Sequence, residues 1–222
     1  MLPTPDTSHL SRQDFENVYE PAEDTFVLLD ALEADIDLIT KNQPLVSLEI
    51  GSGSGCVSVF VESLLKSIPM VHLCTDINPL ALRATDRTYH QNSLPTPNLI
   101  QTSLSAGLRI DRSIDLLVFN PPYVETEEAE YSRANSDAKI SASWAGGTNG
   151  LQLINTLLND LDSILSPSSG TLYMVAVKEN NPEEIVHRMK CKGFEAAIIL
   201  KRRAGREHLH VLRISRHLNA QN

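Results

Sequence analysis

The spacing of hydrophobic and polar residues changes from one segment of this chain to the next. The successive segments predict strands that alternate with helices. Short apolar runs of strand length stand between longer segments in which apolar residues recur at helical intervals. We predict strands over residues 45–50, 71–75, 98–102, 114–119 and 171–177, and an antiparallel hairpin over 195–202 and 207–215. We predict helices within residues 18–37, over 57–66, over 79–90 with Asn78 as its cap, over 150–165, and from residue 181 onward.

Strands that alternate with helices predict one mostly parallel sheet of seven strands with helices on both faces, closed by the antiparallel hairpin. A chain of 222 residues suits a single domain with a full-size core. We expect residues 1–17, rich in Pro, Ser and Asp, to be a flexible tail, and residues 18–222 to form that one domain. Ligands in such sheets bind beyond the carboxyl ends of the strands, where the strand order reverses.

Composition and charge narrow the function. No apolar stretch approaches the roughly 20 residues of a membrane span, so we expect a soluble protein with no membrane partner. Cys56, Cys74 and Cys191 are odd in number and set in apolar contexts, which predicts reduced core thiols of an intracellular protein and no metal site. A net charge of −9 opposes binding to phosphate backbones and favours a neutral or basic protein segment over nucleic acid as the partner.

A glycine-rich turn follows the strand that ends at Ile50. Gly51, Gly53 and Gly55 let the backbone turn tightly and approach a ligand closely. The dinucleotide fingerprint would place its third glycine at Cys56, so this spacing, with Glu49 in front, better suits S-adenosylmethionine. Asp76 ends the next strand, where an acid accepts ribose hydroxyls. The alternative is a structural turn followed by a helix-capping Asp.

The sequence Asn120-Pro121-Pro122-Tyr123 follows the strand over residues 114–119. The Asn120 side-chain oxygen and the Pro121 carbonyl can accept hydrogen bonds from both N–H groups of a planar NH2, which shifts its lone pair toward the nitrogen. The proline pair stiffens the segment and removes competing N–H donors, while Tyr123 offers a face for stacking. We predict Asn120, Pro121 and Tyr123 as catalytic, and these with Pro122 as substrate-binding. Both motifs together predict methyl transfer to a planar nitrogen.

The chain resembles the HemK family of glutamine-N5 methyltransferases, and within it the short eukaryotic member that acts on the class 1 translation release factor. The resemblance rests on residues 19–25, 48–55, 76–79, 119–124, 144–147 and 178–184. It implies a Rossmann-like class I methyltransferase fold. It also implies cofactor contacts from Thr25, Glu49, Gly51, Asp76, Ser103, Leu104 and Asn120, and we add Gly53 from the glycine spacing. Ser103 stands where the family usually has Asp, so a hydroxyl or backbone group replaces that carboxylate.

The resemblance also implies partners and a location. It implies a small zinc-binding activator subunit that pairs along a sheet edge, here residues 98–102. It implies a release factor as substrate, with the methylated glutamine in a Gly-Gly-Gln loop. We expect a cytoplasmic protein, with the nucleus as a second compartment.

Three alternatives stay open from the sequence. Histone lysine methylation would suit the acidic loop within residues 124–147, but a lysine amine must lose a proton and the Asn-Pro-Pro-Tyr motif offers no base. DNA adenine-N6 methyltransferases share that motif, but the net charge and the lack of a target-recognition domain disfavour this activity. A binding scaffold without catalysis is disfavoured because Gly51, Asp76 and Asn120 are all present.

Overall fold

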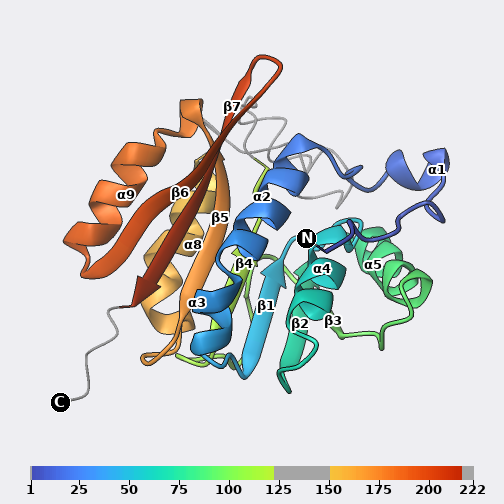
Figure 1. Cartoon of the computed structure of the whole chain (residues 1–222), viewed down its shortest axis with the longest axis horizontal. Coiled ribbons are helices and arrows are strands. Elements are labelled where there is room, and N and C mark those ends of the chain that lie inside the picture. Colours follow the sequence, from blue (N-terminus) through green and yellow to red (C-terminus); the bar gives the residue numbers. More distant parts are fainter. Residues whose placement is uncertain (1, 123–150, 217–222) are drawn as a thin grey trace.

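The computed structural model describes residues 2–122 and 151–216 (Figure 1). Strands and helices fall in the predicted order, with ends that shift by a few residues. The helices are α1 (Arg12–Phe15), α2 (Glu23–Ala34), α3 (Ile36–Lys41), α4 (Cys56–Leu64), α5 (Pro79–Gln91), α8 (Gln152–Ile164) and α9 (Pro182–Cys191), with a 3-10 turn, η2 (Lys178–Asn180). The strands are β1 (Val46–Ile50), β2 (Val71–Asp76), β3 (Asn98–Gln101), β4 (Leu116–Phe119), β5 (Thr171–Val177), β6 (Phe194–Ala204) and β7 (Glu207–Arg216).

The seven strands form one sheet in the order β3-β2-β1-β4-β5-β7-β6. Strands β1 to β5 pair in parallel, whereas β7 pairs antiparallel with both β5 and β6. The chain runs outward from β1 through β2 to β3, and then returns to the other side of β1 with β4. The strand order therefore reverses between β1 and β4, where a ligand site is expected. This topology confirms the predicted class I methyltransferase fold.

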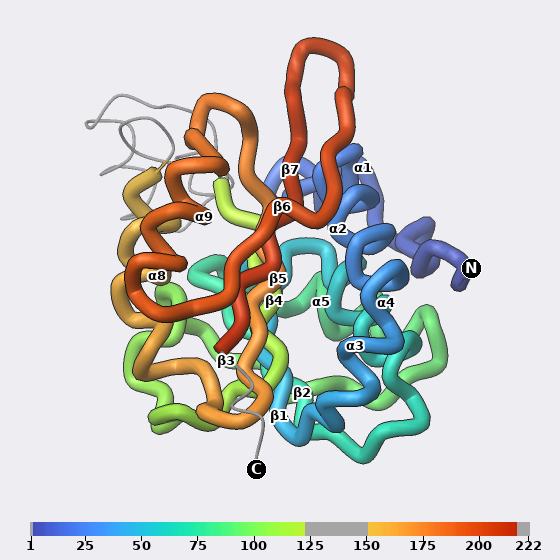
Figure 2. The backbone as a smooth tube through the Cα atoms, turned by 60° about the vertical axis from the view of Figure 1, so that its left-hand side comes forward, coloured from blue at the N-terminus to red at the C-terminus, as the bar shows by residue number. Residues whose placement is uncertain are grey.

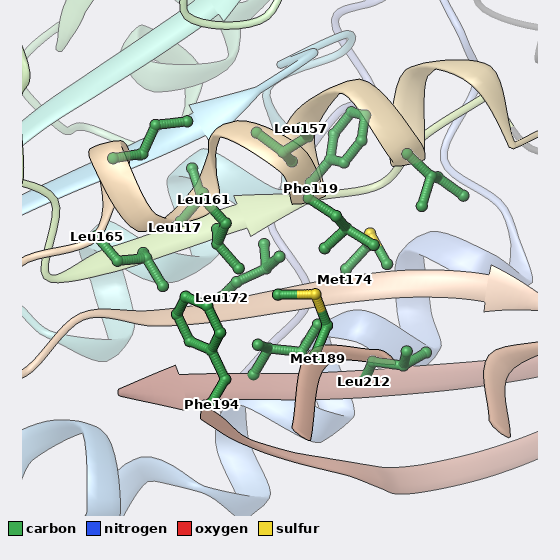
Figure 3. Close-up of a cluster of buried hydrophobic side chains, with 14 of the residues drawn as sticks. Leu117, Phe119, Leu157, Leu161, Leu165, Leu172, Met174, Met189, Phe194 and Leu212 are labelled. Atoms are coloured by element: carbon green, nitrogen blue, oxygen red, sulfur yellow. The ribbon is translucent and has the colours of Figure 1, made fainter. Parts of the chain in front are cut away.

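Helices cover both faces of the sheet because side chains alternate along its strands. In β5, Leu172 and Met174 pack with α8 and α9, while Tyr173 and Val175 pack with α2 and α4. All four side chains are fully buried. Figure 3 shows Leu172 and Met174 in the first of these clusters, among side chains of α8 and α9. Burial on both faces explains why β5 reads as a continuous apolar run.

The β6–β7 hairpin extends past the carboxyl end of β5. Toward the carboxyl end of β5, its pairing with β7 stops at Val177, which lies opposite Leu209. The pairing of β6 with β7 continues past that point to Ala204 and Glu207. Figure 2 shows this hairpin projecting beyond the rest of the described chain. The tip of the hairpin therefore lies on the side of the sheet where the parallel strands have their carboxyl ends.

Residues 2–17, expected to be a flexible tail, contact both α2 and α5. The Asp6 N–H donates to Asn92 Oδ1 at 2.8 Å, and Asp14 pairs with Arg87. Leu10 is buried against alanines of α5. The flexibility of this segment stays a prediction, but it has anchoring contacts that its composition did not indicate.

The helix predicted within residues 18–37 is α2, and it ends before Asp35, which separates α2 from α3. Asp35 accepts hydrogen bonds from Tyr173 Oη (3.0 Å) and Arg213 Nη1 (2.6 Å). One local feature differs from the sequence predictions. Cys191, expected in the core, is exposed, whereas Cys56 and Cys74 are buried as predicted. Among the described residues, no helix is long and apolar enough to cross a membrane.

Candidate active site

One cavity lies at the carboxyl ends of β1, β2, β3 and β4, beside the start of α2. Ten of the residues that the sequence predicted for the site line it: Thr25, Glu49, Gly51, Gly53, Asp76, Ser103, Leu104, Asn120, Pro121 and Pro122. Tyr123 and the acidic loop within residues 124–147 lie outside the described residues. The structure thus brings segments nearly 100 residues apart around one space, while the role of each residue stays a prediction.

The three glycines of the turn after β1 have two different roles. Gly51 and Gly53 adopt φ angles of +72° and +53°, and a Cβ added to either would meet no atom closer than 4.0 Å. Because both residues line the cavity, a side chain there would take up ligand space. Gly55 is different, since its Cβ would lie 2.7 Å from the Thr85 Cα. The third glycine therefore lets α4 approach α5, a role that sequence reasoning missed.

Threonines from β2 and α5 hold the glycine turn in place. The Gly51 N–H donates to the Thr75 carbonyl at 2.7 Å. From α5, Thr85 Oγ1 donates to Ser52 Oγ at 2.9 Å, and Thr88 Oγ1 donates to the Ser54 carbonyl at 2.6 Å. These bonds satisfy buried polar groups and fix the turn against two neighbouring elements. Nothing in the local sequence of the turn points to them.

Two acidic side chains face the cavity from adjacent strand ends. Asp76 accepts hydrogen bonds from the N–H groups of Gly53 (3.0 Å) and Asn78 (2.8 Å). Glu49 is 2% exposed and accepts a hydrogen bond from Ser58 Oγ. Burial, and then the charge of Asp76, raise the pKa of Glu49 well above its usual value, and burial also raises the pKa of Asp76.

Neither acid has a Lys or Arg partner in the described part of the chain. Two desolvated carboxyl groups at one cavity call for hydroxyl donors, which a ribose diol supplies. Next to them, Thr75 Oγ1 donates to the Leu104 carbonyl at 2.8 Å, so the segment after β3 is tied to β2. Ser103 lies in this segment and lines the cavity. These residues could therefore hold an adenosine group.

The Asn120 side chain is held at one end of its amide group. Its Nδ2 donates to Asp24 Oδ2 at 2.9 Å. Its Oδ1 is buried and has no hydrogen-bond partner in residues 2–122 or 151–216. A buried acceptor without a partner costs free energy, and a donor from a ligand would satisfy it. The structure therefore leaves the Asn120 oxygen ready to accept an N–H group.

Asp24 and Tyr19 complete this arrangement, and sequence reasoning missed both as site residues. Asp24 is 3% exposed, and its Oδ1 accepts hydrogen bonds from Tyr19 Oη (3.0 Å) and the Thr25 N–H (2.7 Å). Both residues also line the cavity. The signal that could have found them is the stretch 19–25, in which only Thr25 was assigned a contact.

The fold and the site together define the class of protein. The chain matches the family model described as the methyltransferase small domain over residues 23–138. A solved structure of the E. cuniculi Mtq2–Trm112 complex, responsible for methylation of the eRF1 translation termination factor, superposes with a TM-score of 0.63 at 24% identity, covering 90% of this chain and 98% of that one. The protein is a class I methyltransferase.

Relatives identify the family within that class. The chain is 44% identical to the eRF1 methyltransferase catalytic subunit mtq2 of Schizosaccharomyces pombe, over 97% of this chain and 96% of the relative. It is also 44% identical to the Homo sapiens methyltransferase HEMK2, over 96% of both chains. The chain belongs to the Mtq2/HEMK2 family of methyltransferases. Membership confirms the resemblance found in the sequence.

Proposed function

We propose that this enzyme transfers a methyl group from S-adenosylmethionine to the side-chain nitrogen of the glutamine in the Gly-Gly-Gln loop of a eukaryotic class 1 release factor. The observation that carries the proposal is the Asn120 amide, held at its nitrogen and with its oxygen free, beside the glycine turn. The near-full-length identity to an eRF1 methyltransferase catalytic subunit selects the substrate. A more distant relative, 27% identical, is the putative protein N5-glutamine methyltransferase of Methanocaldococcus jannaschii.

Bound S-adenosylmethionine supplies an electrophilic methyl group on its sulfonium sulfur. Gly51 and Gly53 leave room for it next to their backbone. In the proposal Glu49 and Asp76 would accept hydrogen bonds from the ribose hydroxyls, and the segment at Ser103 and Leu104 would hold the adenine. We also assign cofactor contacts to Thr25 and Asn120, which line the same cavity. Calorimetry that detected no binding of S-adenosylmethionine to the folded protein would contradict this assignment.

The acceptor nitrogen gains nucleophilicity from the residues that hold its hydrogens. Asn120 Oδ1 and the Pro121 carbonyl accept the two N–H groups and draw the lone pair out of the amide π system. The nitrogen–carbon bond forms as the carbon–sulfur bond breaks, and the nitrogen then releases a proton to water. Both oxygens of Asp24, the carboxylate that contacts Asn120, already accept hydrogen bonds. This arrangement suits a neutral amide better than a lysine ammonium, which needs a base. In the proposal Tyr123 stacks on the planar acceptor.

We further propose that a small zinc-binding activator subunit pairs with β3. In the described sheet β3 has β2 as its neighbour on one side and none on the other. An edge of this kind offers unpaired backbone groups for strand addition. The solved E. cuniculi Mtq2 is a complex with Trm112. The proposed location is the cytoplasm, where release factors act, with the nucleus as a second compartment.

A comparison of three acceptors tests the proposed substrate. The enzyme and its activator are incubated with labelled S-adenosylmethionine and with release factor, histone or duplex DNA. We expect strong labelling of the release factor, and none of it with the Asn120→Ala variant, whose folding is checked by circular dichroism. Labelling of histone alone would transfer the function to lysine methylation, and labelling of DNA alone would transfer it to adenine methylation.

A further inference from the structure

Asp24 contacts one end of the Asn120 amide group. An amide group has a donor end and an acceptor end of nearly the same shape, so its orientation is set by its hydrogen-bond partners. A carboxylate only accepts hydrogen bonds. Asp24 Oδ2, 2.9 Å from the Asn120 amide, therefore requires the Asn120 NH2 on its side. The oxygen must then lie at the other end, where it has no partner among the described residues.

Asp24 is itself held firmly. It lies in the first turn of α2, where the helix dipole favours negative charge. Its Oδ1 accepts from the Tyr19 hydroxyl and from the Thr25 backbone N–H, so that position must be occupied by an oxygen. With a side chain 3% exposed, the carboxylate has little water to exchange these partners for. One oxygen is thus fixed by the protein and the other is directed at Asn120.

We propose that Asp24 is a positioning residue that locks the Asn120 amide with its oxygen toward the methyl acceptor. The lock makes the site select a group that donates N–H, such as a carboxamide, and reject a group that presents only acceptors. The inference rests on the proposed function, because it assigns to Asn120 the contact with the acceptor nitrogen.

The isosteric change Asp24→Asn gives a specific expectation. The new side chain must keep its oxygen toward Tyr19 and Thr25, since both are donors, and so turns its NH2 toward Asn120. Two NH2 groups would then face each other, and Asn120 relieves this by flipping. The flipped amide presents NH2 to the acceptor N–H groups. We expect turnover to fall about a hundredfold, as for misplaced catalytic contacts, and cofactor affinity to fall by a smaller factor than turnover.

Exchanging the Asp and Asn side chains between positions 24 and 120 distinguishes loss of this orientation from a general disruption of the site. In Asn120→Asp alone, a carboxylate replaces the amide whose NH2 donates to Asp24 Oδ2 in the wild type, so two like charges face each other. In the double variant Asp24→Asn/Asn120→Asp, the NH2 at position 24 donates to one carboxylate oxygen, and the other oxygen again offers an acceptor to the substrate. We expect the double variant to turn over at least about tenfold faster than either single variant, which is a coupling that independent sites do not show.

The experiment measures release-factor methylation, cofactor affinity and thermal unfolding for wild type, the two single variants and the double variant. Nuclear magnetic resonance of the nitrogen-labelled Asn120 side chain gives a second readout without substrate: its NH2 signals, assigned by their loss in Asn120→Asp, should shift in Asp24→Asn. Tyr19→Phe, which keeps the bond to Asn120, should retain more activity than Asp24→Asn.

The proposal would be wrong if the folded double variant turned over no faster than the single variants. It would also be wrong if the Asn120 NH2 signals did not shift in Asp24→Asn. If the wild type methylates no release factor, the proposed function fails, and the resonance measurement still decides the orientation of Asn120.

Discussion

The three glycines of the turn after β1 differ in what surrounds the position that a Cβ atom would occupy. Gly51 and Gly53 face open cavity, whereas Gly55 faces the backbone of α5. The same residue type therefore borders the cavity at two positions and permits close helix packing at a third. Only the surroundings of each glycine distinguish these roles, because all three have positive φ angles.

Replacing Gly53 by alanine should weaken cofactor binding. The added methyl group would project into the cavity, and we expect S-adenosylmethionine affinity to fall by more than tenfold, or about 1.4 kcal/mol. Gly205→Ala is the matched control, because Gly205 has a similar φ of +59° and an equally open surrounding, at the hairpin tip away from the cavity. Both variants carry the strain of a left-handed residue. Equal affinity of the two in calorimetry would show that the cofactor does not lie against Gly53.

The elements of the sheet were largely predictable from the sequence. The strand β5 was predicted with its observed ends because its apolar run is continuous and lies between Gly170 and Lys178. The helix α5 begins at Pro79 as predicted, since Asn78 caps it and its side chain accepts from the Leu80 N–H at 2.9 Å. Local patterns fix such ends because the cap and the first turn are adjacent in the chain.

Long-range hydrogen bonds were not predictable from local pattern. Asp24 and Asn120 are 96 positions apart, and the threonines that hold the glycine turn lie on other elements. The break between α2 and α3 likewise depends on Arg213 and Tyr173, which bind Asp35 from the sheet. Sequence motifs therefore predicted residues that line one cavity, whereas the contacts that orient their side chains needed the fold.

The pair of β1 and β2 contains a buried histidine that should make stability depend on pH. His72 lies directly opposite Ser47 of β1 and hydrogen-bonds to its hydroxyl through Nδ1. Burial lowers the pKa of His72 from 6.5 to about 4. Below about pH 6.5 the unfolded chain binds a proton that the folded chain excludes, so the free energy of unfolding should decrease as the pH falls through this window.

Between pH 7 and pH 5 this effect amounts to about 2 kcal/mol. The measurement is urea unfolding of wild type and His72→Asn at both pH values, since Asn retains a neutral partner for Ser47 and does not titrate. We expect the wild type to lose about 2 kcal/mol more than the variant over this interval. Equal losses would mean that His72 binds a proton in the folded protein as readily as in the unfolded chain, so that burial does not lower its pKa.

At the scale of the whole molecule, the two edges of the sheet differ. One edge is β6, whose long pairing with β7 carries the projecting hairpin, and the other is the four-residue strand β3. The Thr102 N–H donates to the Asp76 carbonyl at 3.0 Å. Because successive N–H groups alternate along a strand, the Gln101 N–H points away from β2 and toward a partner at this edge.

A proline at this position should prevent pairing with the activator. Gln101→Pro removes the outward N–H and leaves the bonds between β2 and β3 in place, as an edge strand allows. Gln101→Ala keeps the N–H and serves as the control. We expect co-expressed activator to be captured with the wild type and with Gln101→Ala, but not with Gln101→Pro. Capture by all three proteins would place the activator on another surface.

The most direct test of the account is to find the atom that receives the methyl group. Purified enzyme and activator are incubated with release factor, and tandem mass spectrometry locates the modification. We predict one methyl group on the side-chain nitrogen of the glutamine in the Gly-Gly-Gln loop. We also predict no methylation when that glutamine is replaced by asparagine, because a shorter side chain withdraws the nitrogen by more than about 1 Å from the acceptors on Asn120 and Pro121. A methyl group on lysine, or equal methylation of the asparagine variant, would contradict it.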